Sequence, residues 1–211
     1  MNPSKLHLSE EESAMVQDSH WLLTKNSIML KSAELLGVLA AWLQEAFVKA
    51  DVSGNPVLQL SPKIAKGENY NGLPYMMLDY PRFFAKDEIY AWRTMFWWGN
   101  FISVTWHLRG EQLERNRNNI VNAYQQIAHA NFRLCIGEDE WRHDFGADNY
   151  IPVSSISAEL FAKELSDKPF CKLAVKLSLD QWNNAKEKLT DVYGLLLEIG
   201  GFSFQGGETG L

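Results

Sequence analysis

Apolar residues recur every three or four positions along five stretches of the chain, which is the spacing of one face of an α-helix. Two of these stretches begin with a capping-box sequence, Ser9–Glu12 and Ser178–Gln181, whose side chains can satisfy the first free backbone amides. Gly200-Gly201 is a typical helix end. The pattern predicts helices over residues 10–23, 27–50, 110–130, 157–165 and 179–199.

Other stretches alternate apolar and polar residues or are rich in aromatic and β-branched residues, which is typical of strands. They predict strands over residues 74–80, 89–98, 101–108, 132–136 and 171–177. Glycine and proline punctuate residues 51–72, which we expect to be a loop with at most a short strand at 57–60. Residues 201–211 are expected to form a flexible tail.

The order of these elements shows no regular alternation of strand and helix. We therefore expect residues 1–211 to form a single α+β domain, with N-terminal helices in 9–50 and the sheet and other helices in 73–200. The expected sheet is mainly antiparallel, with about four to six strands and a central 89–108 hairpin. Helices are expected to pack on one face of it, beside an N-terminal helical pair.

The centre of the hairpin is Gly99-Asn100, which suits a two-residue type II′ turn and would place Trp98 opposite Phe101. Side chains alternate between the faces of a strand, so this register sorts them into two sets. The set expected to face the core is Ile89, Ala91, Arg93, Met95, Trp97, Ile102, Val104, Trp106 and Leu108. The other set, both aromatic and polar, is Tyr90, Trp92, Thr94, Phe96, Trp98, Phe101, Ser103, Thr105, His107 and Arg109.

Aromatic residues are concentrated around this hairpin, since twelve of the 26 in the chain lie between Tyr70 and Trp106. The aromatic and polar set can form a groove in which rings stack on a ligand while a cation holds an anionic group. The candidate ligand-binding residues are Tyr90, Trp92, Phe96, Trp98, Phe101, His107 and Arg109. Three interpretations remain open for this set: a covered core, a small-molecule pocket, or an interface with another protein or subunit.

A second candidate is the acidic segment 138–148, which holds five acids and one arginine. Its candidate catalytic residues are Glu138, Glu140, His143 and Asp144, because carboxylates beside an imidazole can act as acid and base or bind a cation. The spacing matches no metal-binding motif, and solvated loop charge is the alternative. Arg93, alone among apolar side chains, is expected to pair with Asp79 or Glu88 in a structural ion pair.

Composition and motifs exclude several classes. The net charge of −6 argues against binding to nucleic acid or to anionic membranes. The chain carries no apolar run of signal-peptide or membrane-span length, so a soluble cytoplasmic protein is expected. Cys135 and Cys171 lack metal-ligand spacing and are expected to be buried thiols. No phosphate loop, dinucleotide fingerprint or serine-hydrolase elbow is present, so no cofactor is expected.

These observations favour a binding protein that holds a small molecule or a protein through the hairpin. A metal-assisted or acid/base enzyme that uses the acidic segment is the first alternative. A structural subunit that buries the aromatic face in a homodimer is the second. The sequence alone does not decide whether the protein is an enzyme.

Overall fold

The structure, a computed structural model, describes residues 6–50, 58 and 60–202. Its centre is a seven-stranded sheet in which every neighbouring pair of strands is antiparallel, in the order β1-β2-β3-β4-β7-β5-β6. The strands are β1 (Lys63–Tyr70), β2 (Leu73–Phe84), β3 (Ile89–Trp97), β4 (Phe101–Arg109), β5 (Arg133–Cys135), β6 (Tyr150–Pro152) and β7 (Phe170–Ser178). The α+β class and the antiparallel sheet are confirmed.

The sheet has more strands than expected. The first strand, β1, lies in the segment 51–72 that the sequence predicted to be loop. It is an edge strand that is mostly exposed, so its residues show no apolar alternation, and lysines at Lys63 and Lys66 are typical of such edges. The predicted short strand at 57–60 and most of the predicted tail at 201–211 lie outside the described residues.

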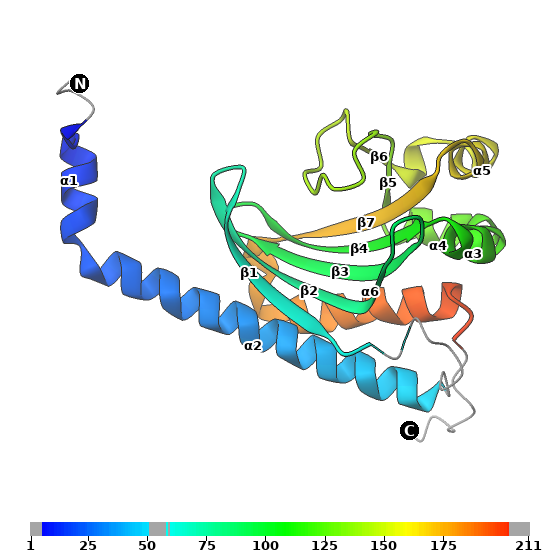
Figure 1. Cartoon of the computed structure of the whole chain (residues 1–211), viewed down its shortest axis with the longest axis horizontal. Coiled ribbons are helices and arrows are strands. Elements are labelled where there is room, and N and C mark those ends of the chain that lie inside the picture. Colours follow the sequence, from blue (N-terminus) through cyan, green and yellow to red (C-terminus); the bar gives the residue numbers. More distant parts are fainter. Residues whose placement is uncertain (1–5, 51–57, 59, 203–211) are drawn as a thin grey trace.

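Two long helices cover one face of the sheet, α2 (Ser19–Lys49) and α6 (Ala185–Ile199) (Figure 1). The main core lies between these helices and the sheet, because both helices turn an apolar stripe toward it. Fully or almost fully buried residues of this core include Leu36, Leu39 and Leu43 of α2, Trp92 and Trp106 of the sheet, and Tyr193 and Leu196 of α6.

Shorter helices complete the chain. The predicted helix over 110–130 is divided at Ala123 into α3 (Glu111–Asn122) and α4 (Tyr124–His129). Ser157 caps α5 (Ala158–Asp167) as expected, accepting a hydrogen bond from the amide of Leu160. The Ser178 side chain makes no cap hydrogen bond, and the helix predicted from 179 begins as the 3₁₀-helix η4 (Leu179–Asn184).

The N-terminal helical pair is present, but its boundary differs from the expected one. The capping box at Ser9 starts α1 (Glu10–Gln17), with both of its hydrogen bonds formed. The chain turns at Asp18, whose carboxylate accepts from the amides of His20 and Trp21 and thereby caps α2. Because of that cap, α2 begins at Ser19 and not near Ser27, and its first turns project from the body together with α1 (Figure 1).

The hairpin at the centre of the sheet is confirmed, but the predicted register is wrong by one residue. Trp97, and not Trp98, lies opposite Phe101, so the loop has the three residues Trp98, Gly99 and Asn100. Gly99 takes a φ of 70°, a left-handed conformation that glycine adopts without strain. The odd-numbered side chains of β3, such as Arg93 and Met95, therefore share a face with the odd-numbered side chains of β4. The sequence had predicted that they share it with the even-numbered ones.

Candidate functional site

The corrected register separates the seven predicted ligand-binding residues into three places. Tyr90, Trp92 and Phe96 point to the helices and are buried with Ile102, Val104, Trp106 and Leu108. Phe101, His107 and Arg109 point to the opposite face, together with Arg93, Met95 and Trp97. Trp98 lies in the turn and is half-buried. No single groove contains all seven.

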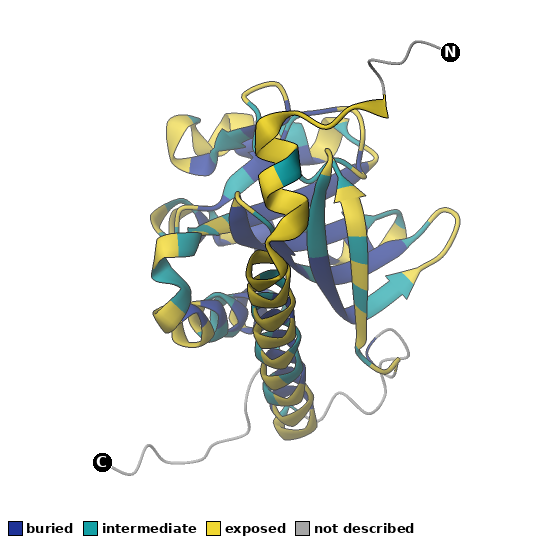
Figure 2. Cartoon of the chain, turned by 90° about the vertical axis from the view of Figure 1, so that its left-hand side faces the viewer, coloured by how far each residue is buried: buried dark blue, intermediate teal, exposed yellow. Residues whose placement is uncertain are grey.

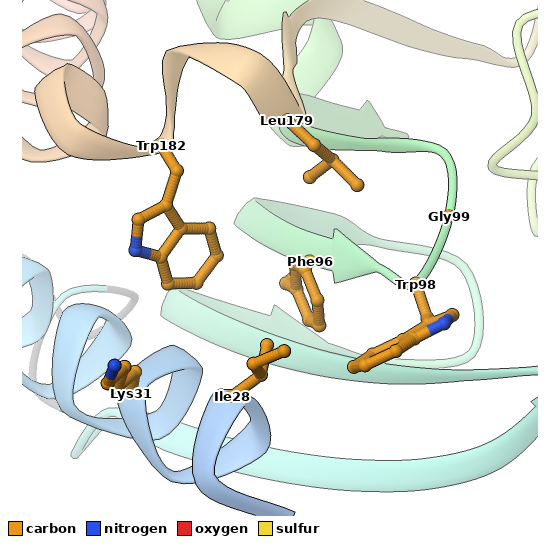
Figure 3. Close-up of a pocket in the computed structure, with 7 residues that line it drawn as sticks. All are labelled: Ile28, Lys31, Phe96, Trp98, Gly99, Leu179 and Trp182. Carbon is orange, nitrogen blue, oxygen red and sulfur yellow. The ribbon is translucent and has the colours of Figure 1, made fainter. Parts of the chain in front are cut away.

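Two of the seven, Phe96 and Trp98, line a pocket of about 480 Å³ at the end of the hairpin (Figure 3). Pockets of this size commonly hold small molecules. We call it the Trp98 pocket. The residues that line it come from α2, from the end of β3 with its turn, and from η4: Ile28, Lys31, Phe96, Trp98, Gly99, Leu179 and Trp182.

The walls of the Trp98 pocket are mainly aromatic. Phe96 lies between the two indoles, with its ring centroid 6.3 Å from that of Trp98 and 5.5 Å from that of Trp182, both in edge-to-face arrangements (Figure 3). Of the seven residues lining this pocket, only Lys31 is charged, and it is exposed at the rim on α2. The pocket therefore presents rings to an apolar body and one cation to a polar end.

The turn fixes the position of Trp98. Its backbone amide donates to the carbonyl of Pro74 over 3.0 Å, which extends the pairing with β2 by one residue. The side-chain amide of Asn100 donates to the Trp98 carbonyl over 2.9 Å. These contacts hold the backbone, while the Trp98 residue stays partly exposed.

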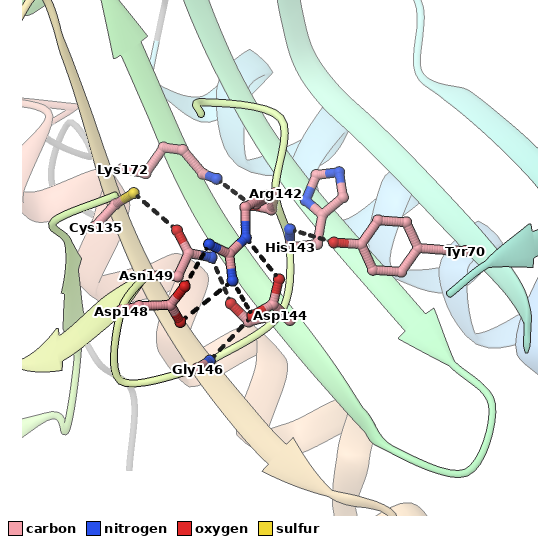
Figure 4. A network of polar contacts seen from close by, with 9 residues as sticks. All are labelled: Tyr70, Cys135, Arg142, His143, Asp144, Gly146, Asp148, Asn149 and Lys172. Carbon is pink, nitrogen blue, oxygen red and sulfur yellow. Dashed lines mark hydrogen bonds and ion pairs between the residues drawn. The ribbon is translucent and has the colours of Figure 1, made fainter. Parts of the chain in front are cut away.

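The acidic segment connects β5 to β6 in the sequence. It lies across the face of the sheet that is opposite to α2 and α6. Tyr70 accepts a hydrogen bond from the backbone amide of His143, and Lys172 of β7 donates to the carbonyl of Arg142 (Figure 4). Phe145 packs edge-to-face on Phe101, with ring centroids 5.0 Å apart. We call the surface beneath this segment the loop-covered face. The acidic segment, for which solvated loop charge was one interpretation, is thus partly a cover for the sheet.

The four candidate catalytic residues do not converge. Glu138 is exposed. Glu140 is buried and bridges His107, 3.1 Å away, and Arg109. Asp144 pairs with Arg142 over 2.8 Å, and Arg142 also pairs with Asp148 (Figure 4). Because arginines match the charges of Glu140 and Asp144, this geometry supports a role in holding the loop in place.

Three basic side chains at the loop-covered face, His107, His143 and Lys172, have lowered pKa values. Burial, and then the charges of Lys172 and Arg93, lowers the pKa of His107 to about 2. Burial also lowers the pKa of His143 to about 3, with the same two cations contributing. Both imidazoles are therefore neutral at pH 7. Burial likewise lowers the pKa of Lys172 to about 8, and no sequence pattern marks this residue, which is one of the polar positions of an alternating strand.

These shifts predict that the protein loses stability in mild acid. An unfolded histidine binds a proton near pH 6.5, whereas His107 and His143 stay neutral in the fold, so acidification favours the unfolded state. Each histidine should contribute a loss of about 1 kcal/mol between pH 6.5 and 5.5, and the slope approaches about 1.4 kcal/mol per pH unit at lower pH. Denaturant unfolding at pH 6.5 and 5.5 measures this slope. The exposed His129 replaced by Gln is the control, and an equally steep slope in His143→Gln would contradict the assignment.

Of the two partners expected for Arg93, the structure confirms Asp79. Its guanidinium binds the carboxylate of Asp79 over 2.7 Å, and it also lies 5.4 Å above the Phe84 ring. Glu88, the other candidate, accepts a hydrogen bond from Gln112. Because the register differs, this ion pair lies on the loop-covered face and not in the main core.

Other features of the described residues bear on the function classes. Cys135 and Cys171 are free and buried, as expected. Within residues 6–50, 58 and 60–202, no three His, Cys, Asp or Glu side chains are grouped as ligands for a metal ion. In the same part of the chain, no helix has the length and apolar character needed to cross a membrane. Comparison of the sequence with models of known protein families, and with curated proteins, finds no match.

Proposed function

We propose that this protein binds a small amphipathic molecule, with an apolar body and an anionic end, in the Trp98 pocket. The observation that carries the proposal is the composition of that pocket: three aromatic and two aliphatic side chains with a lysine at the rim. Apolar surface supplies most of the binding free energy of such ligands, and a few polar groups fix their orientation. The ammonium of Lys31 favours a carboxylate over a neutral or cationic head group.

The arrangement of the rings supports a small molecule. Trp98 and Trp182 stand on the two sides of Phe96, so a chain or ring can contact three aromatic surfaces at once (Figure 3). Hydrogen bonds of the Trp98 amide and of the Asn100 side chain hold the turn, so the part of the wall that the turn supplies is in place before the ligand arrives. A preformed pocket reduces the entropy that binding removes.

Three probes that each carry a linear ten-carbon chain and differ in their head group test this proposal: decanoate, decanol and decyltrimethylammonium. Titration should change the intrinsic tryptophan fluorescence, with decanoate binding more tightly than decanol and the cation most weakly. In Lys31→Met, decanoate should lose about threefold to fivefold in affinity while decanol is unchanged, because one exposed ion pair contributes up to about 1 kcal/mol. Lys186→Met, an exposed lysine that does not line the pocket, should leave both affinities unchanged.

Two results would count against the proposal. One is the absence of saturable binding of decanoate and decanol to the wild-type chain. The other is binding that Trp98→Ala and Trp182→Ala leave unchanged, since both indoles form the walls. Equal affinity for decanoate and the cation would retain an apolar pocket but remove the role of Lys31.

A further inference from the structure

The N-terminal end of the molecule exposes an unusual amount of apolar surface. We call residues 10–28, which comprise α1 and the first part of α2, the N-terminal arm. It contains no buried residue, and it projects from the body except near its end, where Lys25 contacts Glu68 and Ile28 lines the Trp98 pocket (Figures 1 and 2). Its exposed large apolar side chains are Met15, Val16, Trp21, Leu22 and Leu23, with Leu6 and Leu8 just before it. Exposed apolar residues in such a cluster mark an interaction surface.

The spacing in α2 shows that this surface continues the core stripe of the helix. Leu22, Met29, Leu36 and Leu43 follow one another at seven-residue intervals and so lie on one side. The last three are buried against the body, whereas Leu22 is 51% exposed because the body ends before it. An apolar helix face of this kind stabilises the helix when another surface packs against it.

The arm is apolar on more than one side. Leu23 follows Leu22 directly, so it points about 100° away around the helix, and Leu30 repeats that direction seven residues later. Both are more than 60% exposed, at 65% and 67%. A flat surface such as a membrane covers only one side of a helix lying on it. The occupant must therefore enclose the arm from two sides.

The charges along the arm indicate what that occupant is. Residues 10–18 carry four acids, Glu10, Glu11, Glu12 and Asp18, and no base. The rest of the arm, residues 19–28, carries Lys25 and no acid, and Lys31 follows three residues after the arm, ahead of Glu34. Lys25 pairs with Glu68 of β1, but Lys66 shares that carboxylate, so the group remains positive. The arm is thus complementary in charge to a reversed copy of itself.

We propose that two copies of the chain form a dimer by pairing their N-terminal arms antiparallel about a two-fold axis. The acidic end of each arm then lies against the Lys25–Lys31 part of the other, as an isologous contact requires. Since α1 bends away from α2 at Asp18, each arm is hooked, and two hooks enclose each other on more than one side (Figure 1). This contact shares Lys31 with the Trp98 pocket, so a change at Lys31 affects both proposals, whereas Val16 and Leu23 lie outside the pocket and test the dimer alone.

Light scattering of the full chain after size-exclusion chromatography tests the dimer. The wild type should have twice its chain mass of 24.1 kDa. The variant Val16→Glu/Leu23→Glu should have the mass of one chain with an unchanged circular dichroism spectrum, because neither residue contacts the core. Val48→Glu is the matched control, since Val48 is 80% exposed near the other end of the same helix and should leave the dimer intact.

A charge exchange tests the antiparallel arrangement. One variant carries Glu10→Lys, Glu11→Lys and Glu12→Lys, and the other carries Lys25→Glu and Lys31→Glu. Each alone should be a monomer, and an equimolar mixture should form a one-to-one dimer. A monomeric wild type at high concentration would contradict the proposal, as would a dimer that survives Val16→Glu/Leu23→Glu. Sedimentation of a monomeric wild type with phosphatidylserine vesicles would instead assign the arm to a membrane surface.

Discussion

Replacing Trp92 with alanine should lower the free energy of unfolding by about 3–5 kcal/mol, as expected for a large aromatic side chain removed from a packed core. The indole is fully buried, and it stacks on Tyr193 with ring centroids 6.0 Å apart and lies 5.5 Å from the ring of Phe47. The same change at Trp98 should lower it by about 1 kcal/mol, because that side chain is half-buried in a turn.

Denaturant unfolding of the two variants measures this difference. Trp98→Ala should remain folded and lose decanoate binding, so stability and binding are separated between two tryptophans six residues apart. If Trp92→Ala were as stable as Trp98→Ala, the register that pairs Trp97 with Phe101 would be contradicted.

The second large effect is expected at the ion pair beneath the acidic segment. Asp79→Ala should lower the free energy of unfolding by about 3–5 kcal/mol, because it leaves the guanidinium of Arg93 largely buried without its carboxylate. The double variant Asp79→Ala/Arg93→Met should recover most of this loss, since no unpaired charge then remains. Both free energies come from urea unfolding.

Glu88→Ala is the control for this ion pair. Glu88 accepts a hydrogen bond from Gln112 and does not contact Arg93 in the described structure, so its loss should lower the free energy of unfolding by about 1 kcal/mol. A double variant less stable than Asp79→Ala would show that Arg93 stabilises the face through its contacts with the rings of Phe84 and Trp141, and not through its charge partner.

Local signals predicted much of the fold. Ser9 and Ser157 cap helices because each hydroxyl accepts from the amide three residues on, a contact that depends only on nearby sequence. The alternation of β7 was equally clear, since part of that strand has one exposed side. Asp18 also caps a helix. The apolar spacing alone does not show this cap, so the start of α2 was predicted near Ser27 and not at Ser19.

The hairpin register was not predictable from alternation because both faces of β3 and β4 are buried. A strand with one wet face specifies its register strongly, whereas apolar residues on both faces are compatible with either pairing. Gly99 signalled a turn, but its positive φ occurs in loops of two and of three residues. The difference of one residue depends on the packing of the whole sheet against α2 and α6.

The candidate site was predictable only in part for a similar reason. The concentration of aromatic residues pointed to Phe96 and Trp98, which do line the pocket. Ile28 and Trp182 complete its walls from helices that are distant in sequence, and no local pattern shows where those helices pack. The charge of the acidic segment was evident, but its position over His107 depends on long-range contacts such as that between Glu140 and Arg109.

The most direct test of binding in the Trp98 pocket is fluorine NMR of the chain with 5-fluorotryptophan at its eight tryptophan positions, titrated with decanoate. Single Trp→Phe variants assign the resonances. If decanoate binds in this pocket, the signals of Trp98 and Trp182 shift in a saturable way, while those of the buried Trp92 and Trp106 stay in place. Saturable shifts confined to other tryptophans, or none at all, would contradict it.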